Sequence, residues 1–245
     1  MPRTARKKSK TGIYHILLRG INQQQIFADD EDNEMFLEIL RDCKVAGGFK
    51  VYAYCLMGSH AHLLIKVAAE GLEQIFKKIG IRYVYWYNWK YNRTGHLFQG
   101  RFKSEPVESD DYFFTVIRYI HQNPVKAGLT RSIEAYKWSS YKEYVKKRDI
   151  VDTSFALKTM ALKDFIKFNK KKNNDSCLED IASRMSDKDA KEIMKHLVNC
   201  DTVEGFQKLD AIMRNASIKR MKEKGLSIRQ ISRLTGVSKG IVERT

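Results

Sequence analysis

Two histidines two residues apart, in the segment His60-Ala61-His62, are the first feature of this sequence that could do chemistry. They follow an apolar run at 51–57 and a Gly58-Ser59 pair that is typical of a tight turn. On the return strand of the predicted hairpin, side chains two apart project from one face of the sheet. The two imidazoles would therefore stand side by side and share a divalent cation, unless they are structural histidines bonded to the backbone.

A tyrosine and an amide one helical turn apart form a second candidate group. Ser109 is a natural N-cap, and the residues after it predict a helix on which Tyr119 and Asn123 share a face, with Gln122 close by. Pro124 has no N–H to continue the helix, so we expect the helix to end there and the Asn123 amide to turn toward a partner. The segment offers a phenol beside an amide ligand, although Tyr119 alone also fits a half-buried core position.

Together the two groups suit phosphoryl transfer. A divalent cation held by His60 and His62 would polarise a phosphodiester and neutralise developing charge. The Tyr119 oxygen would attack the phosphorus and give a phosphotyrosine and a free sugar hydroxyl, in a reaction that can run backwards to join strands. Asn123, or alternatively Gln122, and water would complete a shell without thiolates, so we expect Mg²⁺ or Mn²⁺.

The charge of the chain indicates a polyanionic partner. Its 245 residues carry 45 Lys and Arg against 29 Asp and Glu, a formal net charge of +16, which favours nucleic acid or an anionic surface. No apolar run approaches the roughly 20 residues of a membrane span, and none follows the basic residues 1–10 as in a secretory signal. The four cysteines show no CxxC spacing, so we expect reduced thiols in a cytoplasmic, nucleoid-associated protein without a membrane partner.

Basic residues spread along the chain are candidate DNA contacts. Residues 1–10 form a basic arm of the kind that grips phosphates, unless it is a solvated tail. The segment 83–91 is densely aromatic and could stack unpaired bases, unless most of its rings are core. The side chains that we expect at DNA are Arg3, Arg6, Lys7, Lys8, Arg19, Arg82, Arg101, Lys103, Lys239 and Arg244.

The order of the predicted elements indicates an α+β fold. These elements are a strand at 12–19, a helix at 29–46, the hairpin at 51–67, a helix at 71–92, a strand within 98–107 and a helix at 109–124. Acidic residues 29–32 crowd the first turn of the first helix, and Gly47-Gly48 ends it. The order suits a ferredoxin-like antiparallel sheet with helices on one face, in a domain at 1–145.

The composition changes after residue 145. Residues 146–175 hold two Lys-rich runs around an amphipathic segment and are predicted to be a basic linker with one helical part. From 176 to 245 the pattern is all-α. Residues 217–245 have helix-turn-helix spacing, in which Ser227 and Ser238 cap two helices and Gly236 allows the tight turn. Such a unit would set its second helix near a duplex major groove, although it also serves in protein contacts.

Several separated motifs resemble those of a known family. His60-Ala61-His62 resembles the HUH motif, and Tyr119-Ile120 followed by residues 123–128 resembles the tyrosine motif of the single-tyrosine HUH transposases. Supporting stretches lie at 14–20, 95–103 and 138–141. Over about residues 3 to 145 the likeness is to the REP-associated tyrosine transposases, which act on short palindromic repeats.

The resemblance implies a metal-dependent single-strand DNA endonuclease and strand transferase. It implies His60 and His62 as metal ligands, Tyr119 as the nucleophile and Asn123 at the position of a third ligand. The implied substrate is single-stranded DNA folded as a hairpin, and the implied intermediate is a 5′-phosphotyrosine. The sequence departs from the motif at Ala61, which is smaller than the usual hydrophobe and removes no reacting group.

The same residues allow two other functions. A domesticated, non-catalytic regulator would bind duplex DNA through the helix-turn-helix without cleaving it, but the intact His60, His62 and Tyr119 favour the transposase. An RNA-binding sheet would carry an aromatic strand motif that this sequence lacks. A monomer and a homodimer are both compatible with the sequence.

Overall fold

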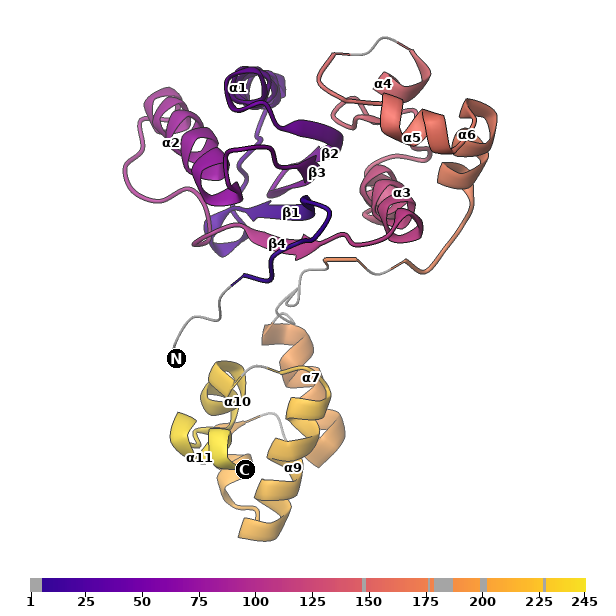
Figure 1. The fold of residues 1–245 in the computed structure, drawn as a ribbon. Helices are drawn as coiled ribbons and strands as arrows, with labels where there is room; N and C mark the ends of the chain where they lie inside the picture. Colours follow the sequence, from indigo (N-terminus) through magenta and orange to yellow (C-terminus); the bar gives the residue numbers. More distant parts are fainter. Residues whose placement is uncertain (1–5, 147–148, 176, 179–186, 199–201, 227) are drawn as a thin grey trace. The chain divides into compact units, whose positions relative to one another are not determined.

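The chain divides into two compact units, Met1–Leu178 and Glu179–Thr245. The computed structural model describes residues 6–146, 149–175, 177–178, 187–198, 202–226 and 228–245. The first unit is α+β, and the described part of the second is all-helical (Figure 1). Among the described helices, none is both long enough and apolar enough to cross a membrane.

The first unit is built on a four-stranded antiparallel sheet. Its strands are β1 (Ile13–Arg19), β2 (Lys50–Met57), β3 (His60–Lys66) and β4 (Lys103–Pro106). They lie in the order β2-β3-β1-β4, with β1 and β3 in the centre and β4 at one edge, as in a ferredoxin-like fold. β2 and β3 form the predicted hairpin through Gly58-Ser59. The register of β1 on β3 sets Arg19 opposite His60, so the far end of β1 lies beside the histidine segment.

Helices cover both faces of this sheet, whereas we expected them on one. The three long helices of the unit are α1 (Asp30–Gly47), α2 (Leu72–Lys90) and α3 (Asp110–Lys126). Helix α2 packs on α1 and over Leu18 on one face, while on the other face Tyr119 of α3 contacts His15, and the strands run between the two helices (Figure 1). Because β1, β2 and β3 are buried along nearly their whole length, both faces need a cover. The prediction holds for α1 and α2 and is wrong for α3.

Local side-chain chemistry sets the ends of α1 as predicted. Asp29 is the N-cap and accepts a hydrogen bond from the backbone N–H of Asp32, while the Asp32 carboxylate accepts one from the N–H of Asp29. This is a reciprocal capping box. Gly48 ends the helix at φ 64°, in the left-handed region that glycine enters without a Cβ penalty. Both ends lie within one residue of the predicted range.

The sequence predicted that the third helix ends at Pro124, but α3 continues past it. It runs on to Lys126 with the proline inside; the N–H of Ala127 donates to the carbonyl of Asn123, and the N–H of Leu129 closes the helix end on the carbonyl of Pro124. The proline removes only its own N–H, and the rest of the turn is held by packing on the sheet. Asn123 is therefore fixed within a helix and does not lie at a fraying end.

The described residues of the segment 146–175, which was predicted to be a linker, pack as part of the first unit. They follow α4 (Tyr141–Val145) and include α5 (Ser154–Thr159) and α6 (Leu162–Lys170). Phe165 and Asn169 of α6 are fully buried, and the Phe165 ring stacks on Tyr144 with 4.3 Å between centroids. Arg118 of α3 makes a two-pronged ion pair with Asp175. The sequence predicted a helical part here but not its packing into the core of the first unit, which extends to Leu178.

The second unit has a small core of its own. Its described helices are α7 (Asp187–Val198), α8 (Val203–Gln207), α9 (Ala211–Glu223), α10 (Ile228–Thr235) and α11 (Lys239–Arg244). Phe206, Ile231 and Val242 are fully buried in it. The turn from α10 to α11 passes through Gly236 at φ 70°, where a Cβ would collide with the side chain of Gln207. Ser238 is the N-cap residue of α11, and the other predicted cap, Ser227, lies outside the described residues.

Candidate active site

The histidine pair lies on the face of the sheet that α3 covers. The rings of His60 and His62 stand 5.3 Å apart between centroids, as the hairpin predicted. His62 is buried and His60 is half-buried, with its Nδ1 3.2 Å from the hydroxyl of Ser59. Within the described residues, the Nε2 atom of each ring makes no hydrogen bond. Each imidazole therefore has one nitrogen for a ligand.

Tyr119 reaches this face from the middle of α3. Its ring centroid lies 5.6 Å from that of His62 and 5.7 Å from that of His15, with edge-on geometry in both cases. The side chain is nearly buried, with 7% of the residue exposed. The ammonium of Lys126 lies 5.3 Å from the centre of the ring. The predicted nucleophile, the predicted histidine and a positive charge thus meet at one place.

A third histidine, His15 of β1, completes the cluster and was not among the predicted site residues. Its Nε2 lies 3.0 Å from Nδ1 of His62, and the side chain is fully buried. Its Nδ1 has no hydrogen-bond partner in the described residues, and the nearest carboxylate oxygen, on Glu105, is 4.0 Å away. The signal that could have found it is the pairing of β1 with β3, which sets His15 and His62 on the same face.

Burial keeps the three imidazoles neutral. It lowers the pKa of His15 to about 3. Burial, and next the positive charge of Arg19, lowers the pKa of His60 to about 4. For His62, burial and then the neighbouring His15 and His60 hold the pKa well below its usual value. At neutral pH the rings carry lone pairs, as metal ligands must.

The two candidate amides at the end of α3 differ in their contacts. Gln122 donates to the carbonyls of Asn169 and Lys171 and accepts from the side chain of Asn173, so its amide faces the segment after α6. Asn123 lies one turn beyond Tyr119 on the same helix face. Its Nδ2 is buried without a hydrogen-bond partner in the described residues. Asn123 therefore has an unpaired amide to offer, and the amide of Gln122 is already engaged.

The other tyrosine of α3 that could compete as nucleophile is engaged elsewhere. The hydroxyl of Tyr112 hydrogen-bonds with Glu105 and Cys177, and burial together with Glu105 raises its pKa. His121 points away from Tyr119, with its ring nitrogens 2.8 Å from the side chain of Asn169 and 3.0 Å from that of Ser140. Neither residue contributes to the histidine cluster.

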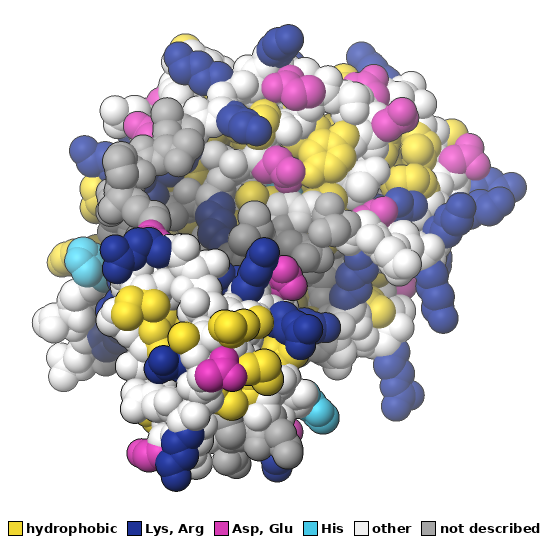
Figure 2. All heavy atoms as spheres, turned by 90° about the horizontal axis from the view of Figure 1, so that it is seen from below, with side chains coloured by type: hydrophobic (Ala, Val, Ile, Leu, Met, Phe, Trp, Pro, Cys, Tyr) yellow, Lys and Arg dark blue, Asp and Glu magenta, His cyan; other side chains and the backbone are white. Residues whose placement is uncertain are grey.

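The predicted DNA-contacting residues fall into separate places. Arg19 and Lys103 lie beside the histidines on the central and edge strands, where burial lowers the pKa of both. Arg6 and Arg101 both pair with Glu73 at α2, and Arg82 pairs with Asp42 of α1. The remaining described ones are exposed, on the arm or on α11: Lys7, Lys8, Lys239 and Arg244. Arg3 lies outside the described residues. Figure 2 shows that Lys and Arg side chains are spread widely over the face in view.

In the part of the chain that the structure describes, the acidic, histidine and cysteine side chains form no closed metal site. Among the described residues, no set of three or more His, Cys, Asp or Glu converges on one point. A metal at this face would therefore use the His60 and His62 nitrogens together with an oxygen from another residue type or from substrate. The Oδ1 atom of Asn123 would be such a donor, and the Nδ2 atom of the same amide has no hydrogen-bond partner among the described residues.

Comparison with known proteins identifies the class. Residues 8–123 match the family described as "Transposase IS200 like", and they form an IS200-like transposase domain. The structure of a REP-associated tyrosine transposase bound to a REP hairpin superposes with a TM-score of 0.52 at 16% identity, over 62% of this chain and 94% of that chain. At this identity the likeness concerns the fold, and it agrees with the family resemblance of the motifs.

A second solved structure, of a Deinococcus radiodurans R1 protein regarded as a transposase, aligns at 19% identity with a TM-score of 0.35. The alignment covers 49% of this chain and 97% of that one. None of the curated proteins matches the chain.

Proposed function

We propose that the protein nicks and rejoins single-stranded DNA that folds as a hairpin, with Tyr119 as the nucleophile. The observation that carries the proposal is the Tyr119 ring held 5.6 Å from that of His62 within an IS200-like transposase domain. The solved relative is bound to a REP hairpin, which supports a palindromic-repeat hairpin as the substrate class.

The proposed step exchanges one phosphoester for another. The Tyr119 oxygen bonds to phosphorus, the bond from phosphorus to the sugar 3′ oxygen breaks, the phenol gives up its proton and the sugar oxygen takes one up. The product is a 5′-phosphotyrosine with a free 3′ hydroxyl, and attack by a 3′ hydroxyl reverses the step and joins strands. Arg19, Lys103 and Lys126 surround the position at which the phosphates would lie and would attract them.

The residues present fit a small divalent cation such as Mg²⁺ or Mn²⁺. His60 and His62 are neutral with one nitrogen each unengaged, and the Asn123 amide is unpaired. When bound, such an ion would polarise the phosphodiester. His15 would hold His62 in one orientation, because its Nε2 occupies Nδ1 of that ring. Of the two predicted third ligands we therefore propose Asn123 and not Gln122.

We also propose that the second unit binds duplex DNA as a helix-turn-helix. Helices α10 and α11 are joined by three residues with Gly236 in the left-handed region, and Val242 of α11 fills the core between them. Lys239 and Arg244 are exposed on α11, the helix that would enter a major groove. The alternative function, a non-catalytic regulator, would use this unit alone.

We infer that the protein acts in the cytoplasm, at the nucleoid. The described cysteines, Cys43, Cys55 and Cys177, are free and buried, which suits a reducing compartment. The net charge of +16 suits a partner such as chromosomal DNA. Location of a fluorescent fusion over the nucleoid tests this inference.

The testing experiment looks for a covalent protein–DNA band. The protein is incubated with a library of single-stranded hairpins and Mn²⁺ and separated under denaturing conditions. Wild type should form the band and Tyr119→Phe should not, whereas Tyr112→Phe, the matched change on the same helix, should retain it. A wild type that binds duplex tightly and never forms the band would favour the regulator instead.

A further inference from the structure

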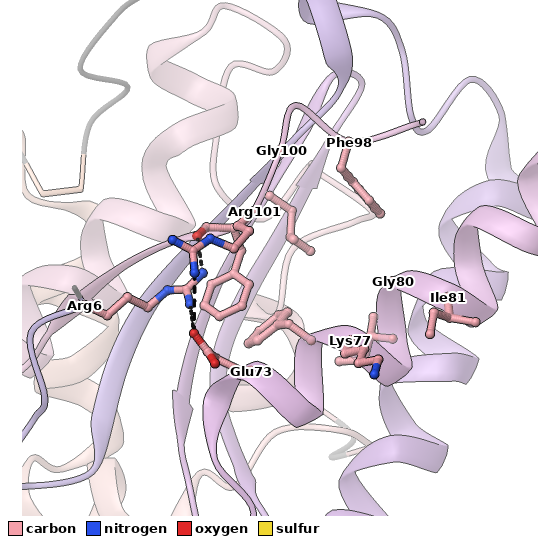
Figure 3. Close-up of a pocket in the computed structure, with 12 residues that line it drawn as sticks. Arg6, Glu73, Lys77, Gly80, Ile81, Phe98, Gly100 and Arg101 are labelled. Carbon is pink, nitrogen blue, oxygen red and sulfur yellow. Dashed lines mark hydrogen bonds and ion pairs between the residues drawn. The ribbon is translucent and has the colours of Figure 1, made fainter. Parts of the chain in front are cut away.

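A pocket of about 370 Å³ lies on the α2 face of the first unit, on the side of the sheet away from the histidines. Its floor is apolar, with Leu18 of β1 and Ile79 of α2 both buried. Figure 3 shows the cationic side chains Arg6 and Arg101 gathered at one side of it and Lys77 on α2 at another. We propose that this pocket receives one unpaired nucleobase of the DNA strand, an inference that rests on the function proposed above.

The walls of the pocket are flat rings. The guanidinium of Arg6 lies 3.9 Å from the centre of the Phe102 ring, and the ring of Phe76 lies 4.6 Å from that of Phe102 between centroids. Phe98 adds a third ring to the lining. Planar aromatic surfaces bind bases of any sequence by stacking, because every base has a π-face. The lining therefore suits a planar group better than a branched apolar side chain.

The rim of the pocket indicates that the group is attached to an anion. Three cations, Arg6, Lys77 and Arg101, stand against a single carboxylate, Glu73. That carboxylate pairs with both arginines and holds their guanidinium groups at the opening (Figure 3). A base in the pocket would bring its flanking phosphates to these cations, which is the combination that proteins use for single strands.

A glycine in the middle of α2 keeps the pocket open. Gly80 lies in the helix interior and lines the pocket, and a Cβ built on it would meet no atom within 4 Å. Glycine inside a helix is less favourable than alanine, and no contact inside the described chain requires it. Its neighbour Ile81 is 61% exposed at the rim. The open space at Gly80, bordered by the exposed Ile81, fits the approach of a ligand.

The pocket and the histidines are joined by one edge of the sheet. Phe102 lines the pocket, and the next residue, Lys103, begins the edge strand β4 opposite Leu17, on the histidine face. Arg101 and Phe102 line the pocket, whereas Lys103 pairs with Leu17 on the histidine face, so a DNA strand crossing this edge would meet Arg101 before the edge and Lys103 after it. The base in the pocket would thus belong to the same strand as the phosphodiester at Tyr119, a short distance along it.

The test places 2-aminopurine, one position at a time, along the unpaired part of a hairpin oligonucleotide that wild type converts to the covalent band. Stacking on an aromatic ring quenches this base, so one position should lose fluorescence when the full-length protein binds. Gly80→Leu fills the opening, and Phe102→Leu keeps apolar bulk but removes the flat ring. Each should abolish the quenching at that position and raise the Kd about fivefold to a hundredfold, as expected for one lost stacked base. Val45→Leu, on an exposed position of α1, is the control and should quench as wild type does.

The outcomes separate the two proposals. A wild type without a covalent band overturns the proposed function. A wild type that forms the band while no position is quenched, or while both variants quench as wild type does, overturns the base pocket and leaves the function standing. A change of sedimentation in Gly80→Leu with unchanged quenching would assign the pocket to a second copy of the chain. Phe102→Leu decides the matter if Gly80→Leu does not fold.

Discussion

The contact between His15 and His62 predicts that replacing His15 weakens metal binding although it is not a proposed ligand. Its Nε2 lies 3.0 Å from Nδ1 of His62, and both rings are buried. If His15 accepts this hydrogen bond, Nδ1 of His62 carries the proton and Nε2 keeps its lone pair for a metal. In His15→Phe the ring volume is kept and the acceptor is lost. His62 then either buries an unpaired N–H or moves its proton to Nε2.

The size of the effect follows from these two possibilities. A buried donor without a partner costs about 1–3 kcal/mol. Loss of the hydrogen-bond partner behind a metal ligand typically costs about 10–100-fold in metal affinity. Because about 1.4 kcal/mol corresponds to tenfold, the two figures agree. We expect Mn²⁺ affinity in His15→Phe to fall by about this factor, and by more in His62→Phe, which lacks the ligand itself.

Calorimetric titration with Mn²⁺ measures the effect, and nitrogen NMR of the metal-free protein reports which nitrogen of His62 carries the proton. His96→Phe is the matched control, because His96 is exposed and outside the cluster. The reasoning about His15 is refuted if His15→Phe binds Mn²⁺ as tightly as wild type while His62→Phe does not. A wild type that binds no Mn²⁺ removes the metal site altogether.

Three further predictions follow from the structure. A protein ending at Leu178 should fold and keep hairpin cleavage, whereas one ending at residue 150 should aggregate because it loses Phe165 and the partner of Arg118; sedimentation and the covalent-band assay compare them. The protein ending at Leu178 should also bind hairpins with flanking duplex with a shallower salt dependence than the full chain, since it neutralises fewer phosphates. An unchanged slope would argue against a DNA-binding second unit. Burial is the chief cause that lowers the pKa of His121 to about 4. The contribution of neutral His121 to the free energy of unfolding is therefore complete above pH 6.5 and is lost as the pH falls from 6.5 toward 4. His121→Gln should therefore lose less stability on acidification, by about 1.4 kcal/mol per pH unit in that window, and equal losses in denaturant titrations would contradict this.

Local chemistry in the sequence predicted the elements that carry the site. The turn at Gly58-Ser59 and the alternation of β3 set His60 and His62 on one face, and the acidic residues 29–32 marked the start of α1. These features depend on residues within one or two turns of each other, so a single sequence contains them. The placement of Tyr119 opposite the histidines followed from the family motif and is matched by the ring contacts.

Contacts between residues far apart in the sequence could not be predicted from local sequence patterns. His15 joins the site only because β1 lies beside β3, an arrangement set by the whole sheet. Pro124 indicated a helix end, but packing of α3 on the sheet outweighs one missing N–H. The helical part of residues 146–175 was predicted, but the Lys-rich runs indicated a linker, whereas Phe165 and Asn169 of α6 are buried in the core. In each case a tertiary contact outweighed a local signal.

The most direct test of the central claim is to locate the DNA on the protein. The covalent product of wild type with a hairpin and Mn²⁺ is digested with protease and nuclease, and mass spectrometry identifies the peptide that carries the nucleotide. The account predicts a phosphate-linked nucleotide on Tyr119 and none on Tyr112, which lies on the same helix. A nucleotide on Tyr112, or an adduct that persists in Tyr119→Phe, would contradict it.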